Sequence, residues 1–209
     1  MVIAFGNIKP GTGKSTLLLL LASYLAGKEK KKIYLIDMQA GGTLGLLSER
    51  SAILEHQLPF EYYHCDLSHF ELLYARLGAE RDAYVLVELP SSMHDERIMG
   101  VFSKLDLLFC PFCYDRPTLN STIYFASLAK RIKTGISLVF LPNRIVSSAG
   151  YEFKQEIDAL LRQISPLSTG IGEHIGFQRI SSLQLDSQLI ERYCATLDLI
   201  YSHYLAKPE

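Results

Sequence analysis

The sequence has almost no net charge and no long apolar runs, and each absence argues against a class of protein. The 209 residues carry a formal net charge of −1, so the chain as a whole has no electrostatic attraction to nucleic acid or anionic lipid. Any such binding needs a local basic patch. Apolar runs fall far short of the ~20 residues of a membrane span. Because a loop follows the first strand-like run at once, we expect no signal peptide.

Cysteine is scarce as well. Four cysteines in a chain of this length indicate a reducing, cytoplasmic setting. Cys110 and Cys113 form a C-x-x-C pair, a pattern found in redox and zinc sites. The pair lies in a strand-like run, and no second C-x-x-C completes a zinc ligand set. We therefore interpret this pair as core residues.

The sequence also has no proline- or serine-rich linker, internal repeat or low-complexity tract. Hydrophobic residues make up 48% and charged residues 21%, which is ordinary for a globular protein. The length suits one α/β domain with a large core. We expect a single domain that spans residues 1–209.

The most informative stretch is residues 2–16. A short apolar run, Val2–Phe5, is followed by a glycine-rich turn over residues 6–13 and then by a leucine run at residues 17–21. This order predicts a strand, a loop and a buried helix. An ordinary glycine turn before a helix is the alternative, but the Gly-Lys-Ser-Thr ending matches the phosphate-binding loop of nucleotide-binding proteins.

Four residues of this loop have the chemistry that phosphate binding needs. Gly11 and Gly13 let the backbone approach an anion, and the start of the helix adds its own unpaired N–H groups. Lys14 supplies a positive charge for the β- and γ-phosphates. The hydroxyl of Ser15 is placed to hold Mg²⁺.

Strand and helix patterns alternate along the rest of the chain. Further strands are expected at residues 33–36, 59–65, 83–89, 105–112 and 136–141, and helices at residues 15–26, 44–56, 67–77, 118–133, 149–164 and 183–204. This alternation implies parallel pairing, right-handed crossovers and helices on both faces. We predict an α/β P-loop NTPase fold, a doubly wound and mainly parallel sheet in three layers.

Two of the expected strands end in a carboxylate. Asp37 follows the strand at residues 33–36, and ligands of such sheets bind at the carboxyl ends of strands. Glu88 follows a continuous apolar run, which indicates a strand buried on both faces. A carboxylate there is costly unless it meets a cation or hydrogen bonds. We interpret Glu88 as an acid that reaches Mg²⁺ through water, with a position at the sheet surface as the alternative.

Residues 9–15, Lys-Pro-Gly-Thr-Gly-Lys-Ser, resemble the deviant Walker A motif K-G-G-x-G-K-[ST] of the ParA/MinD family of partition and positioning ATPases. The resemblance implies that Lys9 reaches across a dimer to the nucleotide bound by the partner subunit. Pro10 departs from the motif, removes one backbone donor and favours an extended Lys9.

Later motifs extend the resemblance, strongly to about residue 145 and weakly beyond it. Asp37-Met38-Gln39, Glu88-Leu89-Pro90 and Asn143-Arg144 stand where the family has D-x-D-P-Q, D-x-P and N-R. The resemblance implies that Asn143 contacts adenine, and its amide suits adenine's donor and acceptor, which favours ATP over GTP. Residues 111–125 resemble a stretch of ParA-like proteins on conjugative and other mobile elements of Bacteroides-type bacteria.

The motifs and the resemblance together assign the expected site for ATP and Mg²⁺. The expected nucleotide contacts are Lys9, Gly11, Thr12, Gly13, Lys14, Ser15, Thr16, Asn143 and Arg144, the metal contacts are Ser15 and Glu88, and the catalytic residues are Lys9, Lys14, Asp37 and Gln39. Gln39 replaces the family's second acid, and Glu88 is one methylene longer than its aspartate. Glutamine orients water but cannot take a proton as a carboxylate does, so we expect slow hydrolysis.

The resemblance implies an ATP-bound homodimer that binds DNA nonspecifically and partitions or positions a plasmid, chromosome or conjugative element. A ParB-like or other small DNA-binding adaptor and a nucleoid-associated location follow from it, and we expect no helix-turn-helix ahead of the first strand. Candidate DNA contacts, with a solvated surface as the alternative, are Lys130, Arg131, Lys133, Lys154, Arg162 and Arg179.

Two other functions stay open. A nucleotide-dependent dimeric scaffold would bind ATP and recruit a partner with little or no hydrolysis. A MinD-like membrane-surface protein needs a basic amphipathic helix at its C-terminus. Residues 200–209 have one lysine and a proline, so we expect no membrane binding.

Overall fold

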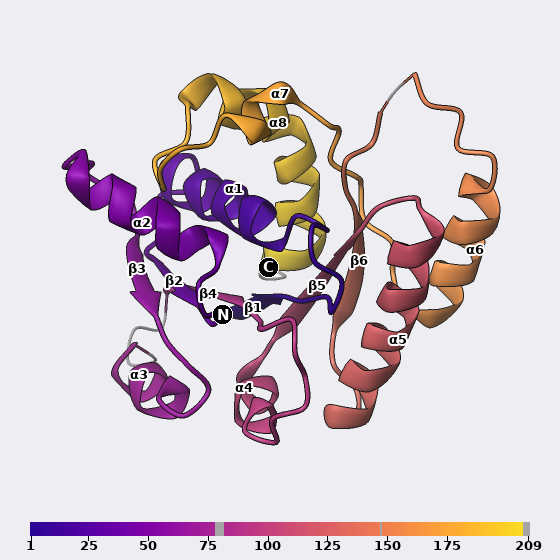
Figure 1. Cartoon of the computed structure of the whole chain (residues 1–209), viewed down its shortest axis with the longest axis horizontal. Helices are drawn as coiled ribbons and strands as arrows, with labels where there is room; N and C mark the ends of the chain where they lie inside the picture. The colour runs from indigo at the N-terminus through magenta and orange to yellow at the C-terminus, as the bar shows by residue number, and fades with distance from the viewer. Residues whose placement is uncertain (78–81, 147, 207–209) are drawn as a thin grey trace.

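The computed structural model describes residues 1–77, 82–146 and 148–206. In this part of the chain, six strands form one sheet in the order β3-β2-β4-β1-β5-β6 (Figure 1), and every pairing is parallel. The strands are β1 (Val2–Phe5), β2 (Ile33–Asp37), β3 (Glu61–His64), β4 (Tyr84–Glu88), β5 (Leu107–Phe112) and β6 (Leu138–Pro142). The predicted parallel sheet is confirmed.

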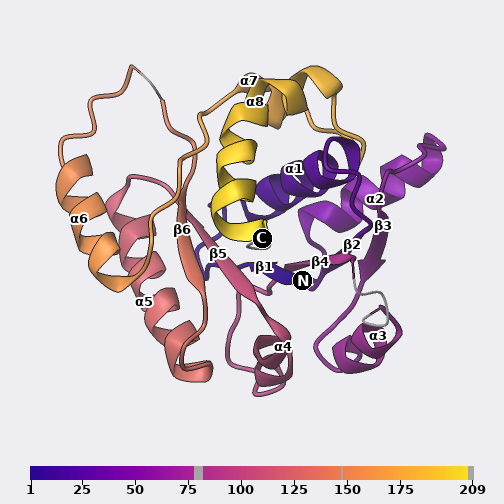
Figure 2. The same ribbon diagram turned by 180° about the vertical axis from the view of Figure 1, so that it is seen from behind.

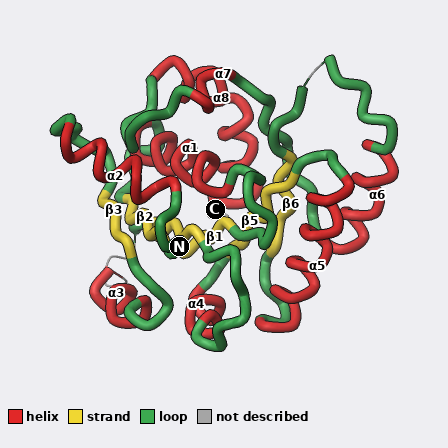
Figure 3. The backbone as a smooth tube through the Cα atoms, viewed as in Figure 1, coloured by secondary structure: helices red, strands yellow, loops and turns green. Residues whose placement is uncertain are grey.

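Helices connect the strands and follow the last one (Figure 3). They are α1 (Lys14–Gly27), α2 (Thr43–Ile53), α3 (Phe70–Leu77), α4 (Ile98–Lys104), α5 (Arg116–Ile132), α6 (Lys154–Ile164), α7 (Ile175–Gln178) and α8 (Ser187–Ile200), and a π-helical turn, Tyr201–Leu205, follows α8. The short helices α4 and α7 were not predicted from the sequence.

Alternate side chains of each strand build two separate cores. Val2 and Ala4 of β1 face one core, which α3, α4, α5 and α6 cover. Ile3 and Phe5 face the other, which α1, α2 and α8 cover. The two views in Figures 1 and 2 show these helices on opposite sides of the sheet, so the predicted three-layer α/β architecture is confirmed.

The helix after the phosphate loop is buried almost all round. Its leucines, residues 17–21, are at most 2% exposed, because the sheet covers one side of α1 and α8 the other. Tyr24 fixes the α1–α8 contact, since its hydroxyl donates a 2.6 Å hydrogen bond to Asp198 on α8. Burial of α1 therefore holds the loop that precedes it against the sheet.

Capping residues explain where the observed helices depart from the predicted ends. The helix predicted at residues 118–133 begins at Arg116, because Asp115 accepts a hydrogen bond from the backbone of Thr118 and a proline occupies the first turn. The helix predicted at residues 183–204 begins only after Asp186, whose side chain caps α8.

The helix predicted at residues 149–164 begins at Lys154, five residues late. Ahead of it the Tyr151 hydroxyl accepts a 3.0 Å hydrogen bond from the backbone of Val146 and donates one of 3.4 Å to the carbonyl of Arg144. These bonds hold the preceding segment as a loop.

Cys110 is fully buried, as predicted, and Cys113 is half-buried; both, with Cys65 and Cys194, are free thiols. Among the helices of the described residues, none combines the length and the hydropathy of a membrane span. The lysine and the proline of the C-terminal tail lie outside the described residues.

Candidate nucleotide-binding site

The phosphate loop and three other polar groups lie at the carboxyl ends of strands of the sheet. The loop follows β1, Asp37 and Glu88 close β2 and β4, and Asn143 follows β6. In the register of the sheet, Glu88 lies opposite Asp37 on one side and Phe5 on the other. The carboxyl ends of the strands thus bring the predicted residues together, as expected for this class of sheet.

Two glycines shape the loop. Gly11 and Gly13 have φ angles of 78° and 93°, the left-handed region that only glycine adopts without strain. A Cβ built on Gly13 would lie 2.1 Å from Nδ2 of Asn143, so a side chain there would displace the Asn143 amide as well as strain the backbone. Helix α1 begins after Gly13 with no side-chain cap, which leaves its first N–H groups available to an anion.

Asn7 anchors the loop, and the sequence analysis did not identify it. Its buried side-chain Nδ2 donates 2.9 Å hydrogen bonds to the carbonyl of Pro111 and to the hydroxyl of Thr122, and its Oδ1 accepts a 3.0 Å bond from the backbone of Lys9. The detectable signal was an asparagine two residues after a buried strand, where an unpaired amide would be costly.

Lys14 is buried and points toward the end of β4. Its Nζ donates a 3.2 Å hydrogen bond to Oγ of Ser91, a residue that the motifs did not include. Burial lowers the pKa of Lys14, and the charge of nearby Glu88 acts in the opposite direction. A phosphate would therefore meet a partly desolvated ammonium, whose attraction to an anion is stronger than in water.

Glu88 and Ser15 form a pair suited to a divalent cation. Ser15 Oγ donates a 2.7 Å hydrogen bond to Oε1 of Glu88, while Oε2 is buried without a hydrogen-bond partner among the described residues. Burial, with a smaller contribution from Asp37, raises the pKa of Glu88 to about 7, although Ser15 and Lys14 oppose the shift. An unpartnered carboxylate oxygen beside a hydroxyl fits Mg²⁺, which prefers oxygen ligands.

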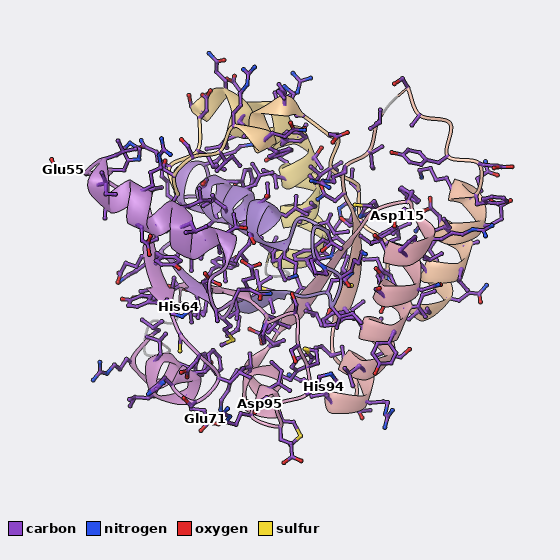
Figure 4. All side chains as sticks on the ribbon, viewed as in Figure 1. Glu55, His64, Glu71, His94, Asp95 and Asp115 are labelled. Atoms are coloured by element: carbon purple, nitrogen blue, oxygen red, sulfur yellow. The ribbon has the colours of Figure 1, made fainter. Side chains whose placement is uncertain are left out.

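Other acidic and histidine side chains do not form a metal centre. Figure 4 shows Glu55, His64 and Asp115 on different parts of the molecule. In residues 1–77, 82–146 and 148–206, no group of three or more His, Cys, Asp or Glu side chains is arranged to hold an ion. Magnesium in nucleotide sites uses few protein ligands together with phosphates and water, so a site of two side chains would not form such a group.

Asp37 is as buried as Glu88, but its carboxylate is fully engaged. Its oxygens accept hydrogen bonds from the backbone of Gln39 at 2.8 Å, from the Tyr62 hydroxyl at 3.2 Å and from the backbone of Gly45. Burial is the largest influence on Asp37 and raises its pKa, and these bonds oppose the shift. The carboxylate holds the loop into α2, and its catalytic role stays a prediction.

Gln39 and Lys14 share a hydrogen-bond partner, Ser91. The Nε2 of Gln39 donates hydrogen bonds to Ser91 Oγ at 2.9 Å and to the carbonyl of Leu89 at 3.1 Å. The amide therefore faces the segment after β4, as the Lys14 ammonium does.

A cavity of about 120 Å³ lies on the other side of the phosphate loop. Asn143 lines it, and the Nδ2 of this residue donates a 2.9 Å hydrogen bond to the carbonyl of Thr12. The other lining residues are Gly13, Thr16, Arg144, Gly172, Glu173, His174, Phe177 and Gln178. Among the described residues, no other hydrogen bond engages the Asn143 amide, so its second N–H and its Oδ1 could meet a base. Residues 172–178 carry no motif and were not predicted from the sequence.

In the described part of the chain, hydrogen bonds hold the backbone of Lys9 but not its side-chain ammonium. Its N–H donates to Asn7, and its carbonyl accepts a 3.5 Å hydrogen bond from the Thr12 hydroxyl. Within the described residues, no hydrogen bond or ion pair engages the Nζ of Lys9.

The six candidate DNA contacts differ in their surroundings. Lys130 and Lys133 donate to backbone carbonyls, and Lys154 pairs with Asp158 at 2.7 Å. Arg131, Arg162 and Arg179 are exposed. The end of α5, which carries Lys130, and the helix α7, next to Arg179, lie at opposite ends of the molecule in Figure 1, so the six residues form no continuous patch.

These features define a P-loop nucleotide-binding protein. The family model of the CobQ/CobB/MinD/ParA nucleotide binding domain matches residues 3–204. The chain therefore belongs to this family, as the motifs predicted, and the family comprises nucleotide-binding ATPases. A sequence comparison with curated proteins gave no match.

Solved structures support the same fold at low sequence identity. A plasmid partition protein from Borrelia burgdorferi bound to AMPPNP is 16% identical, with a TM-score of 0.69 over 96% of this chain and 98% of that one. A McdA variant from Cyanothece in complex with ATP is 15% identical, with a TM-score of 0.72 over 100% and 97%. The cell division protein MinD from Aquifex aeolicus is 16% identical, with a TM-score of 0.67 over 99% and 98%.

Proposed function

We propose that this chain is a ParA-type ATPase that binds Mg-ATP, forms a dimer with it and acts on a DNA cargo through an adaptor. The observation that carries the proposal is the Lys14, Ser15 and Glu88 cluster, in which a buried ammonium and an unpartnered carboxylate oxygen meet at the phosphate loop. Lys14 would bind the β- and γ-phosphates, and Ser15 and Glu88 would hold Mg²⁺. Bound Mg²⁺ would neutralise phosphate charge.

Nucleotide choice follows from the cavity beside Asn143. We propose that adenine occupies it against Thr16, Arg144 and residues 172–178, and that ATP binds more tightly than GTP. Isothermal titration of the protein with each nucleotide in Mg²⁺ buffer tests this, with Lys14→Ala as the variant that should lose both. Equal affinity for the two nucleotides would contradict the assignment of the cavity.

Dimerisation rests on Lys9, whose ammonium no described residue engages. We expect light scattering to detect a dimer with a nonhydrolysable ATP analogue and Mg²⁺, and Lys9→Ala to weaken it. Lys104→Ala, which removes an exposed lysine of α4, is the matched control. A protein that stays monomeric with the analogue would contradict the proposed dimer. A dimer unaffected by Lys9→Ala would show that this lysine does not take part in dimerisation.

DNA binding is proposed through Arg131 and Arg162, exposed at the ends of α5 and α6, which Lys130 joins by donating to the carbonyl of Ile164. Dimerisation would double this pair, and Arg179, next to α7, lies apart from it (Figure 1). Binding through phosphates weakens with salt in proportion to the number of charges neutralised. Each arginine that contacts DNA should therefore reduce the salt slope by about one when replaced by alanine. If the ATP-bound protein does not shift plain duplex DNA at low salt, the DNA-carrier function is wrong.

A second function is a nucleotide-dependent scaffold with little hydrolysis. It is favoured by Gln39 in place of an acid and by the engaged carboxylate of Asp37, which leave no free base beside Lys14 among the described residues except Glu88. The two functions differ in turnover and in DNA binding. Phosphate release with and without DNA separates them.

We also propose a subfamily, an adaptor and a location for this protein. Residues 111–125 support a place among ParA-like proteins of Bacteroides-type mobile elements, with a ParB-like or similar adaptor and a nucleoid-associated location. We further propose that residues 1–209 form one domain, since both cores extend along the whole sheet.

A further inference from the structure

A hydroxyl outside the recognised motifs joins two of the predicted catalytic side chains. Ser91 lies three residues after the end of β4 and is half-buried. Its Oγ accepts hydrogen bonds from Lys14 Nζ at 3.2 Å and from Gln39 Nε2 at 2.9 Å. Ser91 thus connects the phosphate loop, which follows β1, to the segment that follows β2.

The two accepted bonds leave the proton of this hydroxyl without an acceptor among the described residues. A serine hydroxyl has two acceptor lone pairs and one proton to donate. Among the hydrogen bonds of the described residues, Ser91 Oγ serves only as an acceptor, so its proton is available to an anion. The hydroxyl can therefore donate to a phosphate oxygen while it keeps the Gln39 amide.

The position of Lys14 identifies which phosphate this would be. In a phosphate loop the backbone amides and the start of the helix hold the inner phosphates, and the lysine reaches the β- and γ-phosphates. Ser91 contacts the ammonium end of Lys14 and also the Gln39 amide, and it lies three residues after Glu88. The group expected beside this end of Lys14 is the terminal phosphate of a nucleoside triphosphate.

We propose that Ser91 recognises the γ-phosphate, donating its hydroxyl proton to a γ-phosphate oxygen, and that it positions the Gln39 amide beside the reacting group. The proposal rests on the proposed nucleotide site. A diphosphate lacks the group that Ser91 contacts, so this residue distinguishes ATP from ADP. Lys14, which reaches the β-phosphate as well, does not make that distinction by itself.

The test compares affinities for AMPPNP and ADP, both with Mg²⁺, by isothermal titration. Ser91→Ala should weaken AMPPNP binding about tenfold, the typical effect of one hydrogen bond to a charged group, and change ADP binding less than about twofold. Ser91→Thr keeps a hydroxyl and should restore the AMPPNP affinity. The exposed neighbour Ser92 supplies the matched control, Ser92→Ala, which should leave both affinities unchanged.

Single-turnover hydrolysis supplies a second readout. Loss of the Ser91 hydroxyl leaves the Gln39 amide with the Leu89 carbonyl alone, so Ser91→Ala should hydrolyse bound ATP more slowly than Ser91→Thr. Should the alanine variant not fold, Ser91→Cys takes its place, since a thiol is a similar shape and a weak donor.

The outcomes separate this inference from the nucleotide site itself. If the wild-type protein binds neither nucleotide, the proposed function fails. If it binds both and Ser91→Ala weakens both equally, Ser91 only supports the loop and the inference is wrong. Unchanged or tighter AMPPNP binding in Ser91→Ala also overturns it.

Discussion

The ends of β2 and β4 carry two buried carboxylates that are opposite each other in the sheet register but have contrasting surroundings. Asp37 accepts hydrogen bonds from Gln39, Tyr62 and Gly45, so its charge is distributed over donors of the protein itself. Glu88 accepts one bond, from Ser15, and one of its oxygens has no partner among the described residues. The first carboxylate completes a loop, whereas the second keeps an oxygen unused by the described residues at the place where we propose Mg²⁺.

The contrast shows that burial alone does not identify a functional acid. Both carboxylates have a raised pKa for the same main reason, desolvation. The count of donors around each one separates them: a satisfied acid stabilises the fold, and an unsatisfied acid costs stability that a bound cation recovers. Substitutions at Asp37, Glu88 and Gln39 test this difference.

The largest effect is expected at Asp37. Asp37→Ala leaves the donors of Gln39, Tyr62 and Gly45 without an acceptor, so the free energy of unfolding should fall by about 3 kcal/mol. Tyr62→Phe removes only one of these donors and should cost about 1 kcal/mol. Urea denaturation measures both. A loss below that of Tyr62→Phe would show that Asp37 does not hold this loop.

In magnesium-free buffer, Glu88→Gln should raise the free energy of unfolding, whereas Asp37→Ala lowers it. Between its ordinary value of 4.5 and the raised pKa of about 7, folded Glu88 keeps a proton that the unfolded chain has lost. The contribution of protonated Glu88 to the free energy of unfolding is therefore fully present below pH 4.5 and is lost as the pH rises through 7. We expect Glu88→Gln to be more stable than wild type by about 2 kcal/mol at pH 8 and equal to it near pH 4.5.

Thermal melts across this pH range measure the difference, with Glu71→Gln on the exposed face of α3 as the control. The same substitution should reduce the effect of Mg²⁺ on ATP affinity. An advantage of Glu88→Gln that does not change with pH would contradict an ionised, unpartnered Glu88.

The smallest effect concerns Gln39, which contacts both strand ends. Gln39→Asp supplies the carboxylate that the site lacks beside Ser91, and single-turnover hydrolysis should rise severalfold, about 1 kcal/mol in the barrier. ATP affinity should change little, because Lys14, Ser15 and the loop amides are intact. Brisk unstimulated turnover of the wild type, abolished by Lys14→Ala, would contradict the expectation of slow hydrolysis.

Local chemistry explains what the sequence predicted. Gly11 and Gly13 need a left-handed backbone, and the apolar runs before Asp37 and Glu88 need burial, so each could be identified from a few neighbouring residues. The short helix α4, residues 98–104, has too few turns for a clear apolar period, and it was missed.

Contacts between distant segments could not be predicted in this way. Ser91 meets a lysine 77 residues earlier, and Asn7 meets a carbonyl 104 residues later. The partner of Asp37, the Tyr62 hydroxyl, comes from the neighbouring strand. Such pairs depend on strand order, which the sequence pattern did not specify, and they decide which acid is satisfied and which hydroxyl is available.

One hydrogen bond connects the phosphate loop to the cavity lined by Asn143. The Asn143 amide that lines the cavity for the base also holds the Thr12 carbonyl in the phosphate loop, and it occupies the space that any side chain at position 13 would need. The lining of the cavity proposed for adenine and the shape of the phosphate loop therefore depend on the same side chain. A substitution at Asn143 that changes this lining will also disturb the loop, so mutation or evolution at this position alters both together.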